Sequence, residues 1–341
     1  MFRLIISPVS GLFLWSLLFD KSYNISGSPL KMNKKFANTL CACIIVLISA
    51  NFRLNAQNID SKSLLKHIKI LSADSMQGRL TGTEGAKKAR EYIKQQYRDV
   101  KLIPYYPNYE QHFKLKMSVN GDKATVDGCN LIGKIDGDDR SKAIVISAHY
   151  DHVGIKSGKI YNGADDNASS VAVLIEIARY FKSNKPRHTL LFCSFDAEEQ
   201  RLAGSKAFVK DIGGKNEKIV FTCNMDMISI SSTKTLYAAG SYHYSFLKKL
   251  LDAPIKSAKA IHVRWGHDRP ELKHNDWTLL SDHAPFHRAH IPFIYFGVED
   301  HEHYHQPTDR FENIHQEFFI EVSQFILSAI IHIDKNLEMA R

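Results

Sequence analysis

Residues 59–135 show the pattern of two helices followed by a β-hairpin. Apolar side chains recur at helical spacing through residues 59–100, with a break at Gly82–Gly85. Residues 111–135 then alternate apolar and polar positions around the dipeptide Asn120-Gly121, which is typical of a β-hairpin turn. We therefore expect two helices followed by a pair of antiparallel strands.

Beyond residue 140, short apolar runs alternate with amphipathic segments. The runs expected to form buried strands are Ala143–Ala148, Thr189–Phe195, Ile219–Met225 and Ile291–Phe296. The segments with helical spacing are Ala168–Phe181, Gly204–Val209, Tyr244–Leu251 and Phe318–Ile333. This alternation predicts an α/β fold in which helices cover both faces of a mostly parallel sheet. No low-complexity linker or internal repeat interrupts it, so we expect residues 57–341 to form a single domain.

The first 56 residues have a different pattern. From Met32 the chain has a basic stretch, an apolar run at Leu40–Ala50 and a small residue, Ala56, where cleavage is expected. That is the layout of a secretory signal peptide, and it predicts a mature protein in the periplasm or outside the cell. The alternative is an N-terminal membrane anchor, but the run is shorter than the ~20 residues that a span requires.

Residues 1–31 contain a further apolar run, Leu12–Phe19. Two signal-like segments in tandem are unusual. We interpret Met32 as the true start and residues 1–31 as a mis-assigned extension. Cleavage after Ala56 would leave a mature chain without a stable membrane anchor.

Composition adds a limit on partners. Hydrophobic residues make up 44% and charged residues 24% of the 341 residues, which is ordinary for a folded globular chain. The net charge of +9 raises the question of nucleic acid, but residues 1–56 hold six of the 45 basic residues and one of the 36 acids. The remaining 39 basic and 35 acidic residues are nearly balanced. We therefore expect no nucleic-acid partner.

Five cysteines are too few for a disulfide scaffold. Only Cys129, Cys193 and Cys223 follow the expected cleavage point, so at least one thiol is left unpaired. Cys193 and Cys223 lie in apolar runs, where a buried core position is expected.

Acids and histidines follow every predicted strand. In chain order, the strand ends carry His149, Asp151 and His152, then Asp196, Glu198 and Glu199, then Asp226, then His301, His303 and His305, and a loop adds Asp165, Asp166 and Asn167. Ligands of open α/β sheets bind at the carboxyl ends of the strands, so these groups should converge.

Taken singly, such residues are ordinary helix caps or solvated surface groups. Several negative charges at one sheet edge are costly without a cation, however, and imidazole and carboxylate ligands together suit zinc. Two close metals sharing a carboxylate suit hydrolysis of an amide. The strand ends therefore predict a metal site rather than a set of unrelated caps.

These segments resemble, in order, the motifs of the M28 family of co-catalytic zinc aminopeptidases. The matching stretches are HYD at 149–151, GADDNAS at 163–169, AEEQRLAGS at 197–205, NMDM at 224–227 and YHQPTD at 304–309, and MQGRLTGTEGAKKAREYI at 76–93 is similar to the start of such a domain. The resemblance covers nearly all of residues 60–340. It implies an aminopeptidase α/β fold with two zinc ions per chain.

The resemblance also implies a role for each matching residue. One zinc would be held by His149 and Asp226, the other by Glu199 and His305, and Asp166 would bridge them. Asp151 would orient the imidazole of His149, since it lies two residues further along the same strand end. The family often has a cis peptide after the bridging aspartate, which here would be Asp166–Asn167.

Two further residues would take part in the chemistry. Glu198 would be the general base that takes a proton from the zinc-activated water and passes it to the departing amine. Tyr304 resembles the tyrosine that donates to the oxyanion, although a tyrosine beside a ligand can also simply pack. The expected substrate is a peptide with a free N-terminus.

Some positions depart from the family pattern or stay unassigned. Arg201 stands in a stretch that is usually apolar, and could touch substrate or only solvent. Residues 255–277 match nothing in the family, and we expect them to line the specificity pocket. Histidines 262, 267 and 274 lie in that range but are not needed as ligands. His283 lies in a stretch that resembles a family motif near the substrate cleft, and its role could instead be structural.

Three other functions remain open on the sequence. A glutaminyl-peptide cyclase of the same fold would use a single zinc. A secreted binding domain that had lost catalysis would lack ligands, yet all five positions are filled. A carboxypeptidase is the third, because the sequence does not show whether an amine or a carboxylate is anchored.

Overall fold

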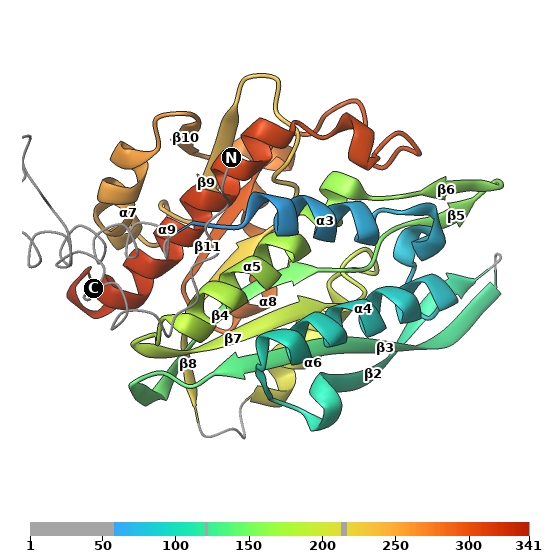
Figure 1. The fold of residues 1–341 in the computed structure, drawn as a ribbon, viewed down its shortest axis with the longest axis horizontal. Helices are drawn as coiled ribbons and strands as arrows, with labels where there is room; N and C mark the ends of the chain where they lie inside the picture. Colours follow the sequence, from blue (N-terminus) through green and yellow to red (C-terminus); the bar gives the residue numbers. More distant parts are fainter. Residues whose placement is uncertain (1–57, 120–121, 213–216, 341) are drawn as a thin grey trace, which may run out of the picture. The chain divides into compact units, whose positions relative to one another are not determined.

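A nine-stranded mixed sheet forms the centre of the molecule (Figure 1). The computed structural model describes residues 58–119, 122–212 and 217–340, so the signal-like segment 1–56 and the turn Asn120-Gly121 lie outside the described residues. The strand order is β1-β3-β7-β4-β8-β11-β9-β10, with β2 paired to β3. The strands are β1 (Ile103–Pro104), β2 (Glu110–Val119), β3 (Asp122–Ile135), β4 (Asp139–His149), β7 (His188–Phe195), β8 (Lys218–Met225), β9 (Thr235–Ala239), β10 (His262–Trp265) and β11 (Phe293–Gly297).

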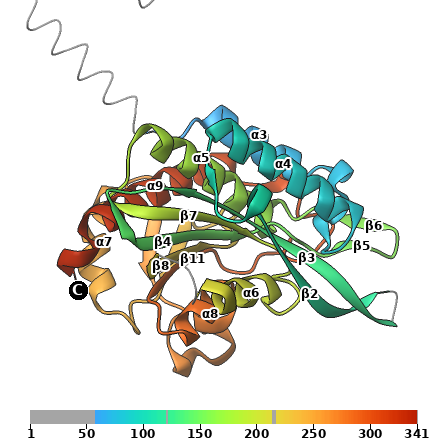
Figure 2. The same ribbon diagram turned by 90° about the horizontal axis from the view of Figure 1, so that it is seen from below.

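The middle of this sheet is parallel. Strands β7, β4, β8 and β11 are parallel neighbours, whereas β3 pairs with β7 and β9 pairs with β11 in the antiparallel sense. Figure 2 shows α3, α4, α5 and α9 on one side of the sheet and α6 and α8 on the other. The mostly parallel α/β fold expected from the sequence is therefore confirmed.

The helices lie close to their predicted positions. They are α3 (Ser61–Leu71), α4 (Glu84–Val100), α5 (Ser170–Ser183), α6 (Ala203–Asp211), α7 (Phe246–Ser257), α8 (His283–Arg288) and α9 (Gln316–Ala340). The sequence pattern missed α8, the strands β9 and β10, and a small hairpin formed by β5 (Gly154–Lys156) and β6 (Lys159–Tyr161). Each of these elements has at most six residues, too few for a period to be recognised.

The two sheet faces have separate cores because successive side chains of a strand point to opposite faces. In β4, Ile144 and Ile146 belong to the larger apolar cluster, while Val145 belongs to the smaller one. Every residue of β7 is buried, as expected for a parallel strand covered on both sides. Cys193 and Cys223 are buried free thiols, which confirms their predicted core positions.

Helix α9 closes the larger core. It is long and apolar enough to cross a membrane, and it is alone in this among the helices of the described part of the chain. However, 56% of its apolar window is buried within the protein. Phe319 and Ile326 are fully buried, and the Phe325 ring meets that of Phe296 edge-on at 5.7 Å. These contacts are those of a core helix.

Asp334, near the end of α9, is buried and fixes the start of β7. Its carboxylate accepts hydrogen bonds from the backbone N–H groups of Arg187 at 2.7 Å and His188 at 2.8 Å, and faces His188 Nδ1 at 3.1 Å. The side-chain hydrogen bond to Asp334 raises the pKa of His188, against the opposing effect of burial. The folded state therefore binds the imidazole proton more tightly than the unfolded chain does.

We expect Asp334→Ala to lower the free energy of unfolding by about 2–4 kcal/mol, because buried hydrogen-bond donors lose a charged acceptor. The His188 part of this loss is fully present below the unfolded pKa of about 6.5 and disappears as pH rises through the higher folded pKa. Urea unfolding of both proteins across that pH range measures it, with the exposed Lys335→Ala as control. A difference that does not shrink with rising pH would contradict the assigned ion pair.

Candidate active site

The carboxyl ends of four parallel strands meet at one edge of the sheet. Strands β4, β7, β8 and β11 run in the same direction side by side. β4 ends at His149, Glu198 and Glu199 follow β7, Asp226 follows β8 directly, and His305 lies in the segment after β11. The fold thus brings together the groups that the sequence placed at this edge.

The predicted metal ligands form two groups that share Asp166. Nε2 of His149 lies 3.2 Å from Oδ1 of Asp226 and 3.3 Å from Oδ1 of Asp166. On the other side, Nε2 of His305 lies 3.1 Å from Oδ2 of Asp166 and 3.3 Å from Oε1 of Glu199. Each carboxylate oxygen of Asp166 therefore faces a different group, the arrangement that a bridging ligand requires.

These donors fit zinc, which takes imidazole nitrogens and carboxylate oxygens. In addition, Oε1 of Glu199 is buried and has no hydrogen-bond partner among the described residues. A buried carboxylate oxygen is rarely left unsatisfied, so a cation is the partner that this cluster lacks.

Asp166 is positioned by groups that hold its backbone. It lies in the kinked turn Ala164–Ser169, where its own backbone is not helical (φ −103°, ψ 93°), and the peptide Asp166–Asn167 is cis, as the family resemblance implied. The carboxylate of Asp309 accepts hydrogen bonds from the backbone N–H groups of Asp165 at 2.8 Å and Asp166 at 3.1 Å. This explains why an aspartate ends the YHQPTD stretch.

Arg79 is a second organiser of the site, and sequence reasoning missed it. Its buried guanidinium donates hydrogen bonds to the carbonyls of Tyr150 at 2.8 Å, Asn162 at 2.6 Å and Gly163 at 2.8 Å, and also to Leu71. Burial lowers its pKa to about 10, against the raising effect of Asp166 and the nearby carboxylates. Arg79 therefore ties together the loops that carry His149 and Asp166. Arg79 lies within the stretch 76–93 that resembles the family. Its role could not be recognised there, because its hydrogen-bond acceptors are backbone carbonyls, which leave no signal in the sequence.

Asp151 holds the two glutamates as well as the histidine. Its carboxylate accepts hydrogen bonds from the backbone N–H groups of Glu198 at 3.0 Å and Glu199 at 3.3 Å. Oδ1 of Asp151 lies 3.6 Å from Nδ1 of His149, and the backbone carbonyl of Asp151 is nearer, at 3.2 Å. The predicted orienting role of Asp151 is compatible with this position, and its carboxylate mainly fixes the loop after β7.

The two adjacent glutamates differ in their electrostatic surroundings. Burial raises the pKa of Glu198 well above its ordinary value, and the carboxylates of Asp226 and Asp282 add to this while His149 opposes it. Burial also acts to raise the pKa of Glu199, but the imidazoles of His152 and His305 hold it below its usual value. A cation between the donor groups would favour the ionised form of both carboxylates.

A small cleft opens beside the two donor groups, with a volume of about 100 Å³. Among the described residues, its charged lining consists of the carboxylates of Asp166, Glu198, Glu199, Asp226 and Asp300 and the imidazoles of His149 and His305, and includes no lysine or arginine. Its apolar lining consists of Met227, Trp277, Leu280, Tyr295 and Val298. Tyr304 also lines the cleft, stacked on the ring of His305 with centroids 4.1 Å apart.

The structure partly corrects the expectation for residues 255–277, since only Trp277 of that range lines the cleft. The ring of His267 stacks on Trp277 with centroids 3.7 Å apart, so His267 supports this wall. His262 and His274 belong to neither donor group, and Arg201 is exposed and does not line the cleft.

The contacts of His283 are those of a structural residue. It is fully buried, and burial lowers the pKa of its imidazole to about 4. Its Nε2 lies 2.9 Å from the carbonyl of Trp277, and its ring packs against Phe293 and Tyr295. His283 therefore supports the wall of the cleft from behind.

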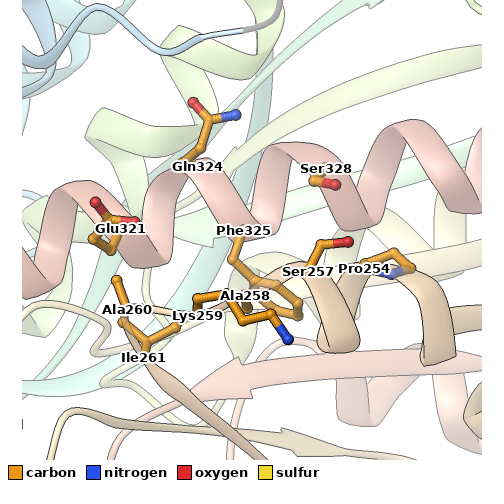
Figure 3. Close-up of a pocket in the computed structure, with 10 residues that line it drawn as sticks. All are labelled: Pro254, Ser257, Ala258, Lys259, Ala260, Ile261, Glu321, Gln324, Phe325 and Ser328. Carbon is orange, nitrogen blue, oxygen red and sulfur yellow. The ribbon is translucent and has the colours of Figure 1, made fainter.

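Two other hollows have linings that differ from that of the cleft. One, of about 700 Å³, shares Glu199 with the cleft and is bordered by Leu80, Met117, Val126 and Ile155. The other, of about 190 Å³, lies between α7 and α9 (Figure 3). Pro254, Ser257–Ile261 and four residues of α9 border it, and Lys259 and Glu321 are its ionisable side chains. This third hollow contains neither donor group.

The chain is similar to known peptidases and to solved structures of the same fold. Aminopeptidase YwaD of Bacillus subtilis is 28% identical over 228 residues, which is 65% of this chain and 47% of that protein, so the chain spans about half its length. Among solved structures, Fimbriiglobus ruber glutaminyl cyclase has a TM-score of 0.66 at 19% identity, covering 81% of this chain and 95% of that one. BSAP, a zinc aminopeptidase from Bacillus subtilis, has a TM-score of 0.66 at 18% identity, covering 80% and 95%.

The two structural likenesses show the shared fold. A sequence model of peptidase family M28 matches residues 130–330, more than half of the chain. That stretch contains both donor groups and the Asp166 that they share, and the chain belongs to peptidase family M28.

Proposed function

We propose that this protein is a secreted or periplasmic aminopeptidase that uses two zinc ions to remove N-terminal residues from peptides. The observation that carries the proposal is the pair of donor groups sharing Asp166 in a cleft whose described lining contains no lysine or arginine. His149 and Asp226 would hold one zinc, Glu199 and His305 the other. When bound, the two ions would polarise the scissile carbonyl and lower the pKa of a shared water.

Glu198 supplies the proton transfers in this proposal. Its side chain lines the cleft and belongs to neither donor group. An ionised Glu198 would accept a proton from the attacking water and deliver it to the departing amine. Burial raises the pKa of Tyr304, so its hydroxyl keeps its proton at neutral pH and is available to donate to the developing oxyanion.

The charge of the cleft favours an amine over a carboxylate as the anchored group. Five carboxylates line it, and two zinc ions would neutralise only part of that charge. A carboxypeptidase needs a cationic side chain for the substrate carboxylate, which Arg most often provides. The substrate ammonium is complementary to this surface, and Asp300 is a carboxylate outside the donor groups that could receive it.

The hollow that shares Glu199 with the cleft offers a place for the rest of the peptide. The cleft, lined in part by Trp277 and Tyr295, has a volume of only about 100 Å³, so the rest of a bound peptide must lie outside it. The larger hollow begins at Glu199 and is bordered by apolar side chains, of which Ile155 is 51% exposed. The proposal therefore includes peptides longer than two residues as substrates.

We expect hydrolysis to depend on a free α-amine. A peptide and its N-acetylated form should differ by at least ~100-fold in kcat/KM, because the blocked form has no positive charge for the carboxylates. Rates for matched free and acetylated peptides measure this, and a C-terminally amidated peptide is the control that should be cleaved normally. Equal cleavage of the blocked form, or a requirement for the free carboxylate, would contradict the proposal.

A glutaminyl-peptide cyclase is the second candidate, since the fold is shared with such an enzyme at the same TM-score as the aminopeptidase. The complete His149–Asp166–Asp226 group favours the dizinc hydrolase. The zinc content and the product formed from a peptide with an N-terminal glutamine decide between the two enzymes. A cyclase would bind one zinc and convert an N-terminal glutamine to pyroglutamate without releasing an amino acid.

The location part of the proposal rests on the signal-like segment from Met32 to Ala56. N-terminal sequencing of the protein from its native host should begin near Gln57. An untrimmed chain recovered from the cytoplasm would contradict it.

A further inference from the structure

A histidine outside the five predicted ligands lies within the second donor group. His152, in the loop after β4, is fully buried. Its Nδ1 lies 2.8 Å from Oε1 of Glu199 and 3.6 Å from Oδ2 of Asp166, the same two oxygens that His305 faces. Donor atoms of all four residues lie within 4.8 Å of one another.

The short approach of His152 to Glu199 lacks the geometry of a well-formed hydrogen bond. Neither ring nitrogen of His152 has a hydrogen-bond partner among the described residues, and neither has Oε1 of Glu199. The distance of 2.8 Å between the two atoms is short enough for a hydrogen bond, so it is the angle at the N–H group that is unfavourable. Two polar atoms that stand this close without pointing at each other are placed as ligands of one ion would be.

The spacing of the four donors also suits a zinc ion. In a tetrahedral site with bonds of 2.0–2.2 Å, donor atoms lie about 3.4 Å apart. The separations from the two carboxylate oxygens to Nδ1 of His152 are 2.8 and 3.6 Å, and those to Nε2 of His305 are 3.1 and 3.3 Å. All four lie within 0.6 Å of the ideal.

The surroundings hold the His152 ring in this place. The backbone N–H of His152 donates to the carbonyl of Arg79 at 3.3 Å. Gly163, at φ 59°, lies against the ring so closely that a Cβ there would come within 2.6 Å of it. The imidazole is therefore fixed before any metal binds.

We propose that His152 is a fourth protein ligand of the second zinc, an inference that rests on the proposed function. The second site would then have two imidazoles and two carboxylates, so that a shared water would be its fifth ligand. Among the described residues, the first site has His149, Asp166 and Asp226, and the same water would be its fourth ligand. The two sites would thus be unequal, because the second is held by one more protein ligand than the first.

X-ray absorption at the zinc edge of the full-length protein tests this without any substitution. We expect three imidazoles for two zinc ions, and the exposed His262→Asn variant should give the same count. Two zinc ions with two imidazoles would overturn this inference and leave the proposed function standing. A protein that binds no zinc would overturn the proposed function and this inference with it.

A matched pair of variants separates ligation from hydrogen bonding. Oδ1 of an aspartate occupies the same branch point as Nδ1 of histidine, so His152→Asp can still ligate a zinc. An amide at this position, in His152→Asn, can donate to Glu199 but is a poor zinc ligand. We expect His152→Asn to lose the second zinc to a chelator at least ~100-fold more readily, and His152→Asp to retain it.

The reverse order, with retention in His152→Asn and loss in His152→Asp, would show that His152 only donates a hydrogen bond to Glu199. Far-ultraviolet circular dichroism of the metal-free variants controls for folding. If either variant fails to fold, the imidazole count of the unsubstituted protein decides the question.

Discussion

Replacing Glu198 with glutamine is expected to lower kcat by at least ~10²–10⁴-fold while both zinc ions stay bound. Glutamine keeps the size of the side chain and its capacity to hydrogen-bond, but its amide cannot accept the proton of the attacking water. KM should change little, since substrate contacts are preserved. Steady-state kinetics together with metal analysis of the purified variant give both quantities.

The expected separation of activity from metal binding follows from the positions of the two glutamates. Glu199 is a member of the second donor group, whereas Glu198 lines the cleft outside both groups. Asp151 holds the backbone of both residues, so the substitution at 198 leaves the position of Glu199 intact.

A neighbouring glutamate provides the control for this prediction. Glu302 is 88% exposed, and Glu302→Gln should behave like the unsubstituted protein. Near-normal kcat in Glu198→Gln would exclude the general-base role. Loss of one metal from Glu198→Gln would instead mean that the roles of Glu198 and Glu199 are interchanged.

The sequence predicted the central sheet because burial on both faces leaves a continuous apolar run. The strands β4, β7 and β8 have such runs, and their helices have clear amphipathic spacing. Strand β10 has alternating exposed and half-buried residues over only four positions, which matches no strong pattern. Its place in the sheet depends on pairing with β9.

Four of the five candidate ligands could be found from the sequence because they end or follow a recognisable strand, and the fifth, Asp166, because it lies in a recognisable motif in the loop before α5. Arg79 could not, since three of its acceptors are carbonyls of segments that follow it by 71–84 positions. His152 was visible in the sequence, but its approach to Glu199 depends on the loop that turns back after β4. Trp277 lies in the range that was expected to line the specificity pocket. The other residues of 255–277 form the end of α7, the strand β10 and the turns around it.

If Asp166 bridges two zinc ions as proposed, replacing it with alanine is expected to remove both of them and with them nearly all activity. Oδ1 of Asp166 faces His149, and Oδ2 faces His305 and His152. Losing a shared ligand should weaken each site by more than the ~10–100-fold that the loss of a supporting residue costs. Zinc content after dialysis against a chelator measures the effect at both sites together.

Variants of the unshared ligands give the comparison. Asp226→Ala should weaken only the first site, and Glu199→Ala only the second, because each belongs to one donor group. The two single-site variants should each retain one zinc per chain under conditions in which Asp166→Ala retains none. Two bound zinc ions and normal activity in Asp166→Ala would show that this residue does not bridge.

The fold around residue 166 should survive the substitution, so that metal loss can be measured on a folded protein. The backbone N–H of Asp166 is held by Asp309 and the preceding loop by Arg79, and neither contact uses the Asp166 side chain. Removing one carboxylate from a cluster of buried acids also relieves repulsion in the metal-free protein. Metal-free Asp166→Ala should therefore unfold at or above the temperature of the metal-free parent, and only the parent should gain stability when zinc is added.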